Sequence, residues 1–336
     1  MFVGKESFCD YRTLREAVEA LEQDASMKPE TLYILSGRYE EQVVIYRSHL
    51  HIVGIGDVEI AMNRYAKERD EHGEEIGTFA TPTLFLGGSH LVVENLTISN
   101  TAGQGEKIGQ AVAVYAHCDQ TVFRNCTLKG HQDTLFTGPL PPAPRERAVF
   151  GGIPLREHHA HYRQFYQNCY IEGTVDFIFG GATAVFEACE IRSLVHEGGG
   201  VGYITAASTP LGQKHGYVFR DCFLTGEQGV PKASVYLGRP WREYAQTVFI
   251  HCLMGEHIHP EGWDNWNNPA NEATVRYLEL GTRNKDAGRL RSSRVPWAEC
   301  LEDTDGEREY RTEHVFSGTD FWRQGRGFLE ISDPDL

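Results

Sequence analysis

A short pattern that ends in cysteine recurs along the middle of the chain. An aromatic residue is followed by two further residues and then by Cys, and an apolar version of the pattern begins the series. The six copies are VENL, FRNC, YQNC, FEAC, FRDC and FIHC, which end at Leu96, Cys126, Cys169, Cys189, Cys222 and Cys252. Irregular spacing about one constant core pattern is typical of a solenoid, whose coils keep their inward residues and vary their loops. The repeat therefore predicts a parallel β-helix with internal aromatic and cysteine ladders, and six copies in order disfavour the alternative of a β-sandwich.

The segments on either side fit the same architecture. The β-rich runs TLYIL, EEQVVIY, HLHIVGI and TLFLGG predict short strands ahead of the repeat. The segment TLREAVEALEQ predicts a short helix that caps the open end of the solenoid, with Thr13 as N-cap and an apolar face made by Leu14, Ala17, Val18 and Leu21. We expect TVRYLEL, residues 274–280, to be the last strand and the remainder to pack along the outside. Residues 1–336 are predicted to form a single domain.

Two copies of the repeat continue alike, because an aspartate follows the cysteine seven positions later. These aspartates are Asp133, after Cys126, and Asp176, after Cys169. Parallel coils would bring the two aspartates about 4.8 Å apart along the stacking axis. Two carboxylates held this close cannot both ionise easily, so one pKa rises and that group can act as an acid.

A carboxylate pair supports two reaction classes, glycoside hydrolysis and ester hydrolysis through a carboxylate nucleophile. Ester attack also needs donors for the developing oxyanion, and Gln132 and Gln110 are placed to supply them. Arg239 is a fork-shaped cation suited to fixing the nucleophile. An aspartate at a coil corner can also simply cap backbone groups, but two in one register, with Gln and Arg in reach, favour catalysis.

A long segment rich in proline and charge separates the two aspartates. It contains GPLPPAPRERAVFGGIPLREHHAH and predicts an inserted loop over about residues 138–161. Because the loop leaves directly after the Asp133 strand, we expect it to overhang the cleft and to influence specificity. Its histidines His158, His159 and His161 are interpreted as solvated loop residues, because no carboxylate or helical spacing supports a metal site.

Tryptophans stand beside glycine and proline in LGRPWREY and in GWDNW, residues 237–244 and 262–266. Such tryptophans commonly form a platform for a sugar ring, although burial under a loop is the alternative. We interpret these two segments as a carbohydrate-binding platform.

Composition narrows the possible partners and the compartment. The net charge of −15 and the lack of a basic stripe argue against nucleic acid, and no apolar run of the length of a membrane span occurs. The eight cysteines lack CxxC spacing and mostly occupy one position of the repeat, so we expect buried thiols, with no disulfide framework and no zinc site. The polar N-terminal stretch, which contains Lys5 and Glu6, predicts a cytoplasmic protein if Met1 is the native start.

The motifs resemble those of the pectin methylesterases, carbohydrate esterases that remove methyl groups from the galacturonate chain of pectin. The matching segments appear in the family's order and are GRYEEQVVI, NTAG, GQAVA, GHQDTLF, RQFYQNCYIEGTVDFIFG, GYITAAS, YLGRPW and GWDNW. The resemblance implies an all-β fold, a single-stranded right-handed parallel β-helix, and a mechanism without metal or cofactor.

The resemblance also implies roles for residues at the motif positions. Asp176 would be the nucleophile and Asp133 the acid and base, while Gln110 and Gln132 would stabilise the anionic intermediate and Arg239 would orient Asp176. The residues that would line the sugar subsites are Tyr115, Phe136, Val175, Phe179, Trp241 and Trp263. The sequence departs from the family in its long inserted loop and in Ala207, which stands where many relatives have Gln.

The expected substrate is methyl-esterified homogalacturonan or oligogalacturonides, and a cytoplasmic enzyme would act on short, imported oligomers. We expect a monomer with no nucleic-acid or membrane partner. The alternatives are a pectate lyase or polygalacturonase on a similar solenoid, and a non-catalytic carbohydrate-binding β-helix. A serine esterase is disfavoured because the sequence contains no GxSxG segment.

Overall fold

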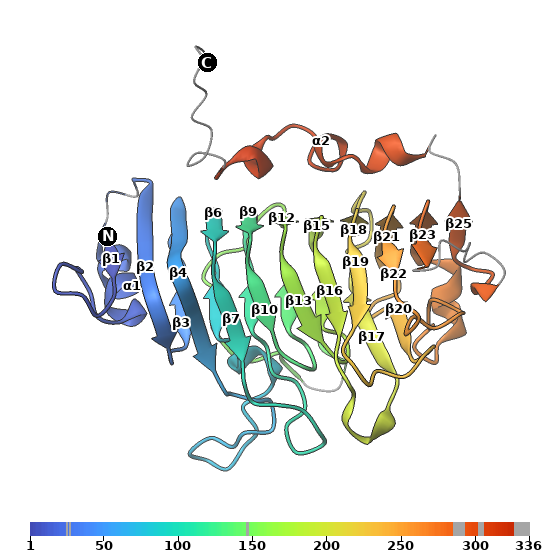
Figure 1. Ribbon diagram of the computed structural model, residues 1–336, viewed down its shortest axis with the longest axis horizontal. Helices are drawn as coiled ribbons and strands as arrows, with labels where there is room; N and C mark the ends of the chain where they lie inside the picture. Colours follow the sequence, from blue (N-terminus) through green and yellow to red (C-terminus); the bar gives the residue numbers. More distant parts are fainter. Residues whose placement is uncertain (25, 27, 146–147, 285–292, 302–305, 326–336) are drawn as a thin grey trace.

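The strands of this protein pair in parallel from one end of the molecule to the other (Figure 1). The computed structural model describes residues 1–24, 26, 28–145, 148–284, 293–301 and 306–325. The larger sheet contains β1 (Phe2–Val3), β2 (Glu30–Tyr39), β4 (Leu50–Met62), β6 (Ser89–Glu94), β7 (Thr97–Asn100), β9 (Asp119–Arg124), β10 (Thr127–Lys129), β12 (Arg163–Gln167), β13 (Tyr170–Gly173), β15 (Thr183–Glu187), β16 (Glu190–Ser193), β18 (Tyr217–Arg220), β19 (Phe223–Gly226), β21 (Gln246–Ile250), β22 (Leu253–Met254), β23 (Arg276–Leu280), β24 (Arg283–Asn284) and β25 (Glu299–Leu301). The smaller sheet contains β3 (Val43–Ile45), β5 (Leu84–Leu86), β8 (Val114–Ala116), β11 (Leu135–Thr137), β14 (Ile178–Gly180), β17 (Gly202–Ala207) and β20 (Val235–Gly238). This is the predicted parallel β-helix.

Each repeat of the cysteine pattern contains a corner of the solenoid. In the copy that ends at Cys126, β9 ends at Arg124 and β10 begins at Thr127, and Asn125 between them has a φ of 53°. Asparagine tolerates this left-handed conformation better than most residues. The corresponding residues in the other copies also have positive φ and are Asn95, Asn168, Ala188, Asp221 and His251. The chain therefore turns at the same place in every coil.

The predicted aromatic ladder runs through the interior. Successive rings of Phe123, Tyr166, Phe186, Phe219 and Phe249 stack with centroid separations of 4.9, 4.6, 4.4 and 4.5 Å and nearly parallel planes. These separations match the spacing of strands in a sheet. The aromatic side chains therefore stack because the backbone repeats.

The cysteines form a second ladder beside the aromatic one. Cys126, Cys169, Cys189, Cys222 and Cys252 are buried, and all five are thiols that form no disulfide. Each of these five sulfhydryl groups donates to backbone carbonyls, as Cys222 does to Phe186 at 3.4 Å. The prediction of buried thiols is confirmed.

Helix α1 (Leu14–Gln23) covers the first coil as predicted. Thr13 is its N-cap, and Thr13 and Glu16 form a capping box in which each side chain accepts from the other residue's backbone N–H. Its buried residues are Leu14, Ala17, Val18 and Leu21. The described residues include no helix long and apolar enough to cross a membrane.

The segment after β23 differs from the expectation in one respect. The strands β24 and β25 follow, so TVRYLEL is not the last strand. The chain then crosses the outer face of the larger sheet through the short helices Glu307–Tyr310, α2 (Thr312–Val315) and Phe321–Arg323 (Figure 1). Their apolar side chains cover Val122, Phe165, Val185 and Val218. Other short helices that the structure describes in full are Thr78–Ala80, Glu197–Gly199 and Pro269–Ala273.

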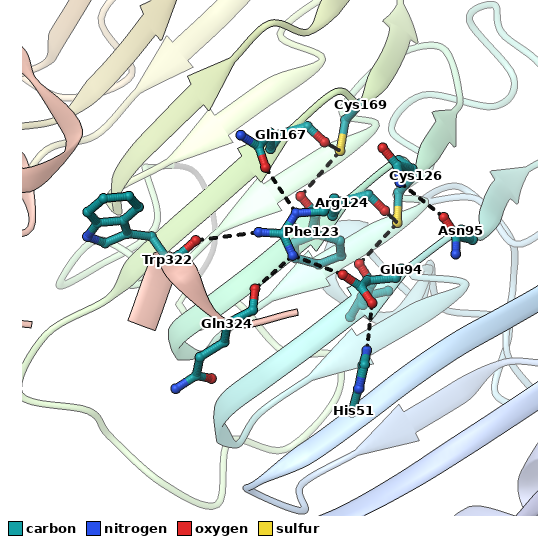
Figure 2. Close-up of polar contacts among 12 residues, drawn as sticks. His51, Glu94, Asn95, Phe123, Arg124, Cys126, Gln167, Cys169, Trp322 and Gln324 are labelled. Carbon is teal, nitrogen blue, oxygen red and sulfur yellow. Dashed lines mark hydrogen bonds and ion pairs between the residues drawn. The ribbon is translucent and has the colours of Figure 1, made fainter. Parts of the chain in front are cut away.

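One buried arginine fastens this C-terminal segment to the solenoid (Figure 2). Arg124 donates to the backbone carbonyl of Gln324 at 2.7 Å and to the Glu94 carboxylate at 2.9 Å. A third bond, at 2.9 Å, goes to the side chain of Gln167 in the next coil. Hydrogen bonds to a charged donor are among the stronger ones, so the segment is held by polar as well as apolar contacts.

Candidate active site

Asp133 and Asp176 hold equivalent places in adjacent coils, as predicted. Each lies two residues before a strand of the smaller sheet, and these strands, β11 and β14, pair with Leu135 opposite Ile178. The Asp133 backbone N–H donates to the carbonyl of Val175 at 3.1 Å. Both aspartates have positive φ, 66° and 50°, a conformation that Asp adopts more readily than most residues.

Arg239 fixes one of the two carboxylates. It follows β20, and its Nε and Nη2 atoms donate to the two oxygens of Asp176 at 2.8 and 2.7 Å. The guanidinium carbon also lies 3.9 Å from the ring centroid of Tyr203 and 3.9 Å from that of Trp266. A bidentate bond together with two cation–π contacts leaves the arginine little rotational freedom.

The two aspartates have different electrostatic surroundings. Asp133 is 8% exposed, and burial raises its pKa well above the usual range, with a further rise from the charge of Asp176. Asp176 is 6% exposed, and burial raises its pKa too, but the hydrogen bonds and charge of Arg239 oppose that rise. The surroundings therefore favour the proton on Asp133 and the negative charge on Asp176.

A cleft of about 480 Å³ opens over this pair. Both aspartates and Arg239 line it. Gln110, one coil before Asp133, and Gln132, one coil before Asp176, line it as well. A second cavity of about 860 Å³ adjoins the first and shares Lys67, Gln110 and Gln132 with it. The five residues predicted to be catalytic are thus brought together in a cleft that adjoins a second cavity.

The aromatic residues predicted for the subsites divide into two layers. Phe179 and Trp241 line the cleft, as predicted. Tyr115 and Phe136 do not, because they are buried beneath it in an edge-to-face pair with centroids 4.7 Å apart. They support Phe79, a cleft residue that the sequence did not single out.

The two tryptophans of the GWDNW segment lie in different surroundings, and one of them corrects the prediction. Trp263 is 1% exposed and stacks on Tyr277 in the core with a centroid separation of 4.1 Å, so it cannot present a face to a sugar. Its backbone bridges to Gly238 of the preceding coil, which turns its side chain inward. Trp266 of the same GWDNW segment lines the cleft instead.

Val175 and Ala207 do not line the cleft. Val175, which was predicted to line a sugar subsite, is half-buried outside the cleft lining. Ala207 is buried, whereas its neighbour Ala206 lines the cleft.

The inserted loop overhangs the cleft, as expected from its position. Its residues Pro144, Arg145, Val149 and Phe150 line the cleft wall. Its far end is packed against the N-terminal coils, where Arg156 pairs with Glu22 at 2.8 Å. His158 and His161 are exposed, but His159 bonds to the carbonyl of Gly87 at 3.0 Å and is packed rather than solvated.

Comparison with known proteins identifies the family. The Pectinesterase family model matches residues 1–153 and 157–319. The chain belongs to the pectinesterase family. It is 33% identical over 306 residues to the Arabidopsis thaliana protein "Probable pectinesterase/pectinesterase inhibitor 64", covering 86% of this chain and 46% of that protein. It is 30% identical to "Pectinesterase 31" of the same plant, covering 90% of this chain and 88% of that protein.

Two solved structures of this pectinesterase fold resemble the chain over nearly its whole length. Pectin methylesterase PemA from Erwinia chrysanthemi matches with a TM-score of 0.76 and 28% identity, covering 95% of this chain and 97% of that one. The pectin methylesterase from carrot matches with a TM-score of 0.78 and 26% identity, covering 94% and 92%. The chain spans about half the length of the first curated relatives that it matches, at 41% to 52% of each.

Proposed function

We propose that this protein hydrolyses the methyl esters of galacturonate residues in pectin or oligogalacturonides and releases methanol. The observation that carries the proposal is the unequal carboxylate pair, in which Arg239 binds Asp176 and not Asp133. Family membership supports it, and so does the similarity to a pectin methylesterase solved in complex with a hexasaccharide, at 28% identity.

The geometry suits an acyl transfer in two steps. The ionised Asp176 attacks the C6 carbonyl carbon, and the amides of Gln110 and Gln132 donate to the oxygen that becomes negative. Asp133 gives its proton to the departing methoxide, which leaves as methanol. The Asp133 carboxylate then takes a proton from water, whose oxygen attacks the acyl carbon and frees both the acid product and Asp176.

Ester hydrolysis fits this site better than glycoside hydrolysis, the other reaction class open to a carboxylate pair. The two glutamines line the cleft beside the pair, where they serve an oxyanion. A glycosidase stabilises an oxocarbenium ion, which is positively charged and gains nothing from amide donors or from Arg239. Cytoplasmic location, action on short imported oligomers and a monomeric state stay predictions.

The test is methanol release from methyl-esterified oligogalacturonides by the wild type, Asp176→Ala and a control, with chain length and unsaturated products followed in the same samples. We expect wild type to release methanol without shortening the chain, and Asp176→Ala to lose about 10³-fold or more of the rate. Asp221→Asn is the control, because Asp221 is an exposed corner aspartate with a similar φ of 52°. Shortened or unsaturated chains without methanol would overturn the proposal.

A further inference from the structure

Two long loops border the second cavity and touch each other across it. The first, residues 101–113, joins β7 to β8, and the second, residues 194–201, joins β16 to β17. Both project beyond the ends of the strands (Figure 1). The connections between them are shorter, with residues 130–134 leading to β11 and residues 174–177 leading to β14. The long loops therefore stand on either side of the two coils that carry the carboxylate pair.

The side chain of Gln104 joins these two loops. Its Nε2 atom donates to the backbone carbonyl of Val195 at 2.9 Å, and its Oε1 atom accepts from the backbone N–H of Glu197 at 3.1 Å. One amide thus pairs with a C=O and an N–H of the opposite loop, as a neighbouring strand would. Gly105 is packed against the same loop, because a Cβ added there would lie 2.8 Å from a carboxylate oxygen of Glu197. We call this contact of Gln104 and Gly105 with residues 195–197 the Gln104 bridge.

The Gln104 bridge spans the two coils that carry the carboxylate pair. Along the larger sheet, β7 pairs with β10, β10 with β13, and β13 with β16. Asp133 follows β10, and Asp176 follows β13. Because the bridge connects the loop after β7 to the loop after β16, it links the coil before the pair to the coil after it.

The second cavity lies between the Gln104 bridge and the surface of these coils. The bridge residues line it together with Gln132 and Thr174, which stand one and two residues before the two aspartates. The cavity has a volume of about 860 Å³ and shares Gln132 with the cleft. A galacturonate chain with one ester at Asp176 would therefore extend from the cleft into a space that the bridge covers.

We propose that the Gln104 bridge makes this esterase act from one end of the galacturonate chain. A chain enters a covered passage only end first, whereas an open groove admits any internal stretch of a polymer. This inference rests on the proposed function and names its preferred substrate, which is a short oligogalacturonide or an ester near a chain end. Gln104 is then a residue that determines specificity and takes no part in the acyl transfer.

The experiment compares kcat/KM for methanol release, per methyl ester, between methyl-esterified trigalacturonate and methyl-esterified polygalacturonate. We expect wild type to favour the trimer by about tenfold or more, and Gln104→Ala to bring the ratio to within about threefold of one. Gln104→Asn should behave like the alanine variant, because its amide is one methylene shorter and cannot reach both backbone partners. Cutting the polymer into short pieces beforehand should raise the wild-type rate, since each cut creates new ends.

The control is Gln213→Ala. The Gln213 amide also bonds to two backbone groups, the carbonyls of Gly181 at 3.0 Å and His215 at 2.8 Å, but Gln213 lies outside the described residues that line the cleft and the second cavity. This variant should keep the wild-type ratio. If wild type hydrolyses trimer and polymer equally well, or if Gln104→Ala leaves the ratio unchanged, the inference is wrong while the proposed function stands.

Absence of methanol from both substrates would mean that the proposed function fails. Titration calorimetry with the same trimer and polymer then tests the Gln104 bridge alone. We expect Gln104→Ala to bind the polymer with a Kd about tenfold lower than that of wild type, because removal of the bridge opens the passage to internal stretches of the chain. An equal Kd for the polymer in the two proteins would overturn the inference.

Discussion

Asp133 and Asp176 are the same residue type in the same register, and one arginine makes them chemically different. Burial raises the pKa of both carboxyl groups, but only Asp176 receives the two hydrogen bonds from Arg239. A buried acid without such a partner is costly to ionise. The site therefore keeps Asp133 in an environment that suits catalysis and opposes stability at neutral pH.

This cost predicts how Asp133→Asn changes stability with pH. The pKa of Asp133 is raised in the folded state, so its stabilising contribution is complete below the unfolded pKa of about 3.9 and is lost as pH rises through the folded pKa. The amide does not ionise, so we expect the variant to have a Tm higher than wild type at pH 7 by about 2 °C or more. The gain should disappear toward pH 4 in scanning calorimetry.

Asp221→Asn is the reference, because Asp221 is exposed and should give no pH-dependent gain in Tm. An Asp133→Asn variant that is less stable than wild type at pH 7 would contradict the argument, and would mean that Asp133 is ionised and favourably bound in the folded protein.

The residues of the site were predictable to different degrees. Asp133, Asp176 and Arg239 could be placed because the repeat fixes the register of the coils. Which tryptophan of GWDNW faces the cleft could not, because it depends on the bridge that turns Trp263 inward and leaves Trp266 outside. Arg145 carries no signal of its own within a loop of prolines and charges.

At the scale of elements, the aromatic ladder is what joins one coil to the next. Phe186 is fully buried and stacks on Tyr166 at 4.6 Å and on Phe219 at 4.4 Å. Its strand β15 belongs to the larger sheet, whereas Asp176 leads into β14 of the smaller one. Ladder packing and catalytic geometry are therefore carried by different walls of the coil.

We expect Phe186→Ala to lower the free energy of unfolding by about 3–5 kcal/mol, because it removes a buried ring and leaves a cavity between two others. Urea unfolding followed by fluorescence measures this. The matched control is Phe223→Ala in the neighbouring strand β19, whose ring is 52% exposed and should cost less than about 1 kcal/mol. Equal costs for the two variants would contradict a role for the ladder.

The strands and the internal ladders could be predicted from the sequence repeat. The backbone conformation of every corner residue and the C-terminal strands could not. Asparagine at a corner is explained by its tolerance of positive φ, yet Ala188 and His251 adopt the same conformation in their copies. Their backbone is set by stacking on neighbouring coils, which local sequence does not encode. The same applies to β24 and β25, which exist because they add to an edge already formed.

At the scale of the molecule, the elongated solenoid has a long outer face on its larger sheet, and the apolar residues of that face need to be covered. Residues 306–325 do so on the larger sheet, where Phe316 packs edge-on against Phe165 with a centroid separation of 6.4 Å (Figure 1). Arg124 supplies the polar attachment (Figure 2). Without this cover, a contiguous apolar surface would face the solvent.

Phe316→Asp should release the C-terminal segment, because it places an unpaired charge at a buried position. We expect increased binding of an apolar dye and concentration-dependent association in size-exclusion chromatography, with methanol release per molecule within about twofold of wild type, because the cleft lies over the smaller sheet. Ser317→Asp adds the same charge at the next, exposed residue and should do neither. A monomeric Phe316→Asp variant without dye binding would show that the segment is dispensable as a cover.

The cysteine ladder makes the order of unfolding readable along the chain. Burial raises the pKa of the Cys126 and Cys222 thiols well above the usual range, so neither reacts while its coil is closed. Coils of a solenoid contact mainly their neighbours and can open in sequence from an end. Five thiols lie one per coil from Cys126 to Cys252. They would then be alkylated in the order in which their coils unfold, so that the reaction of each thiol reports when its own coil opens.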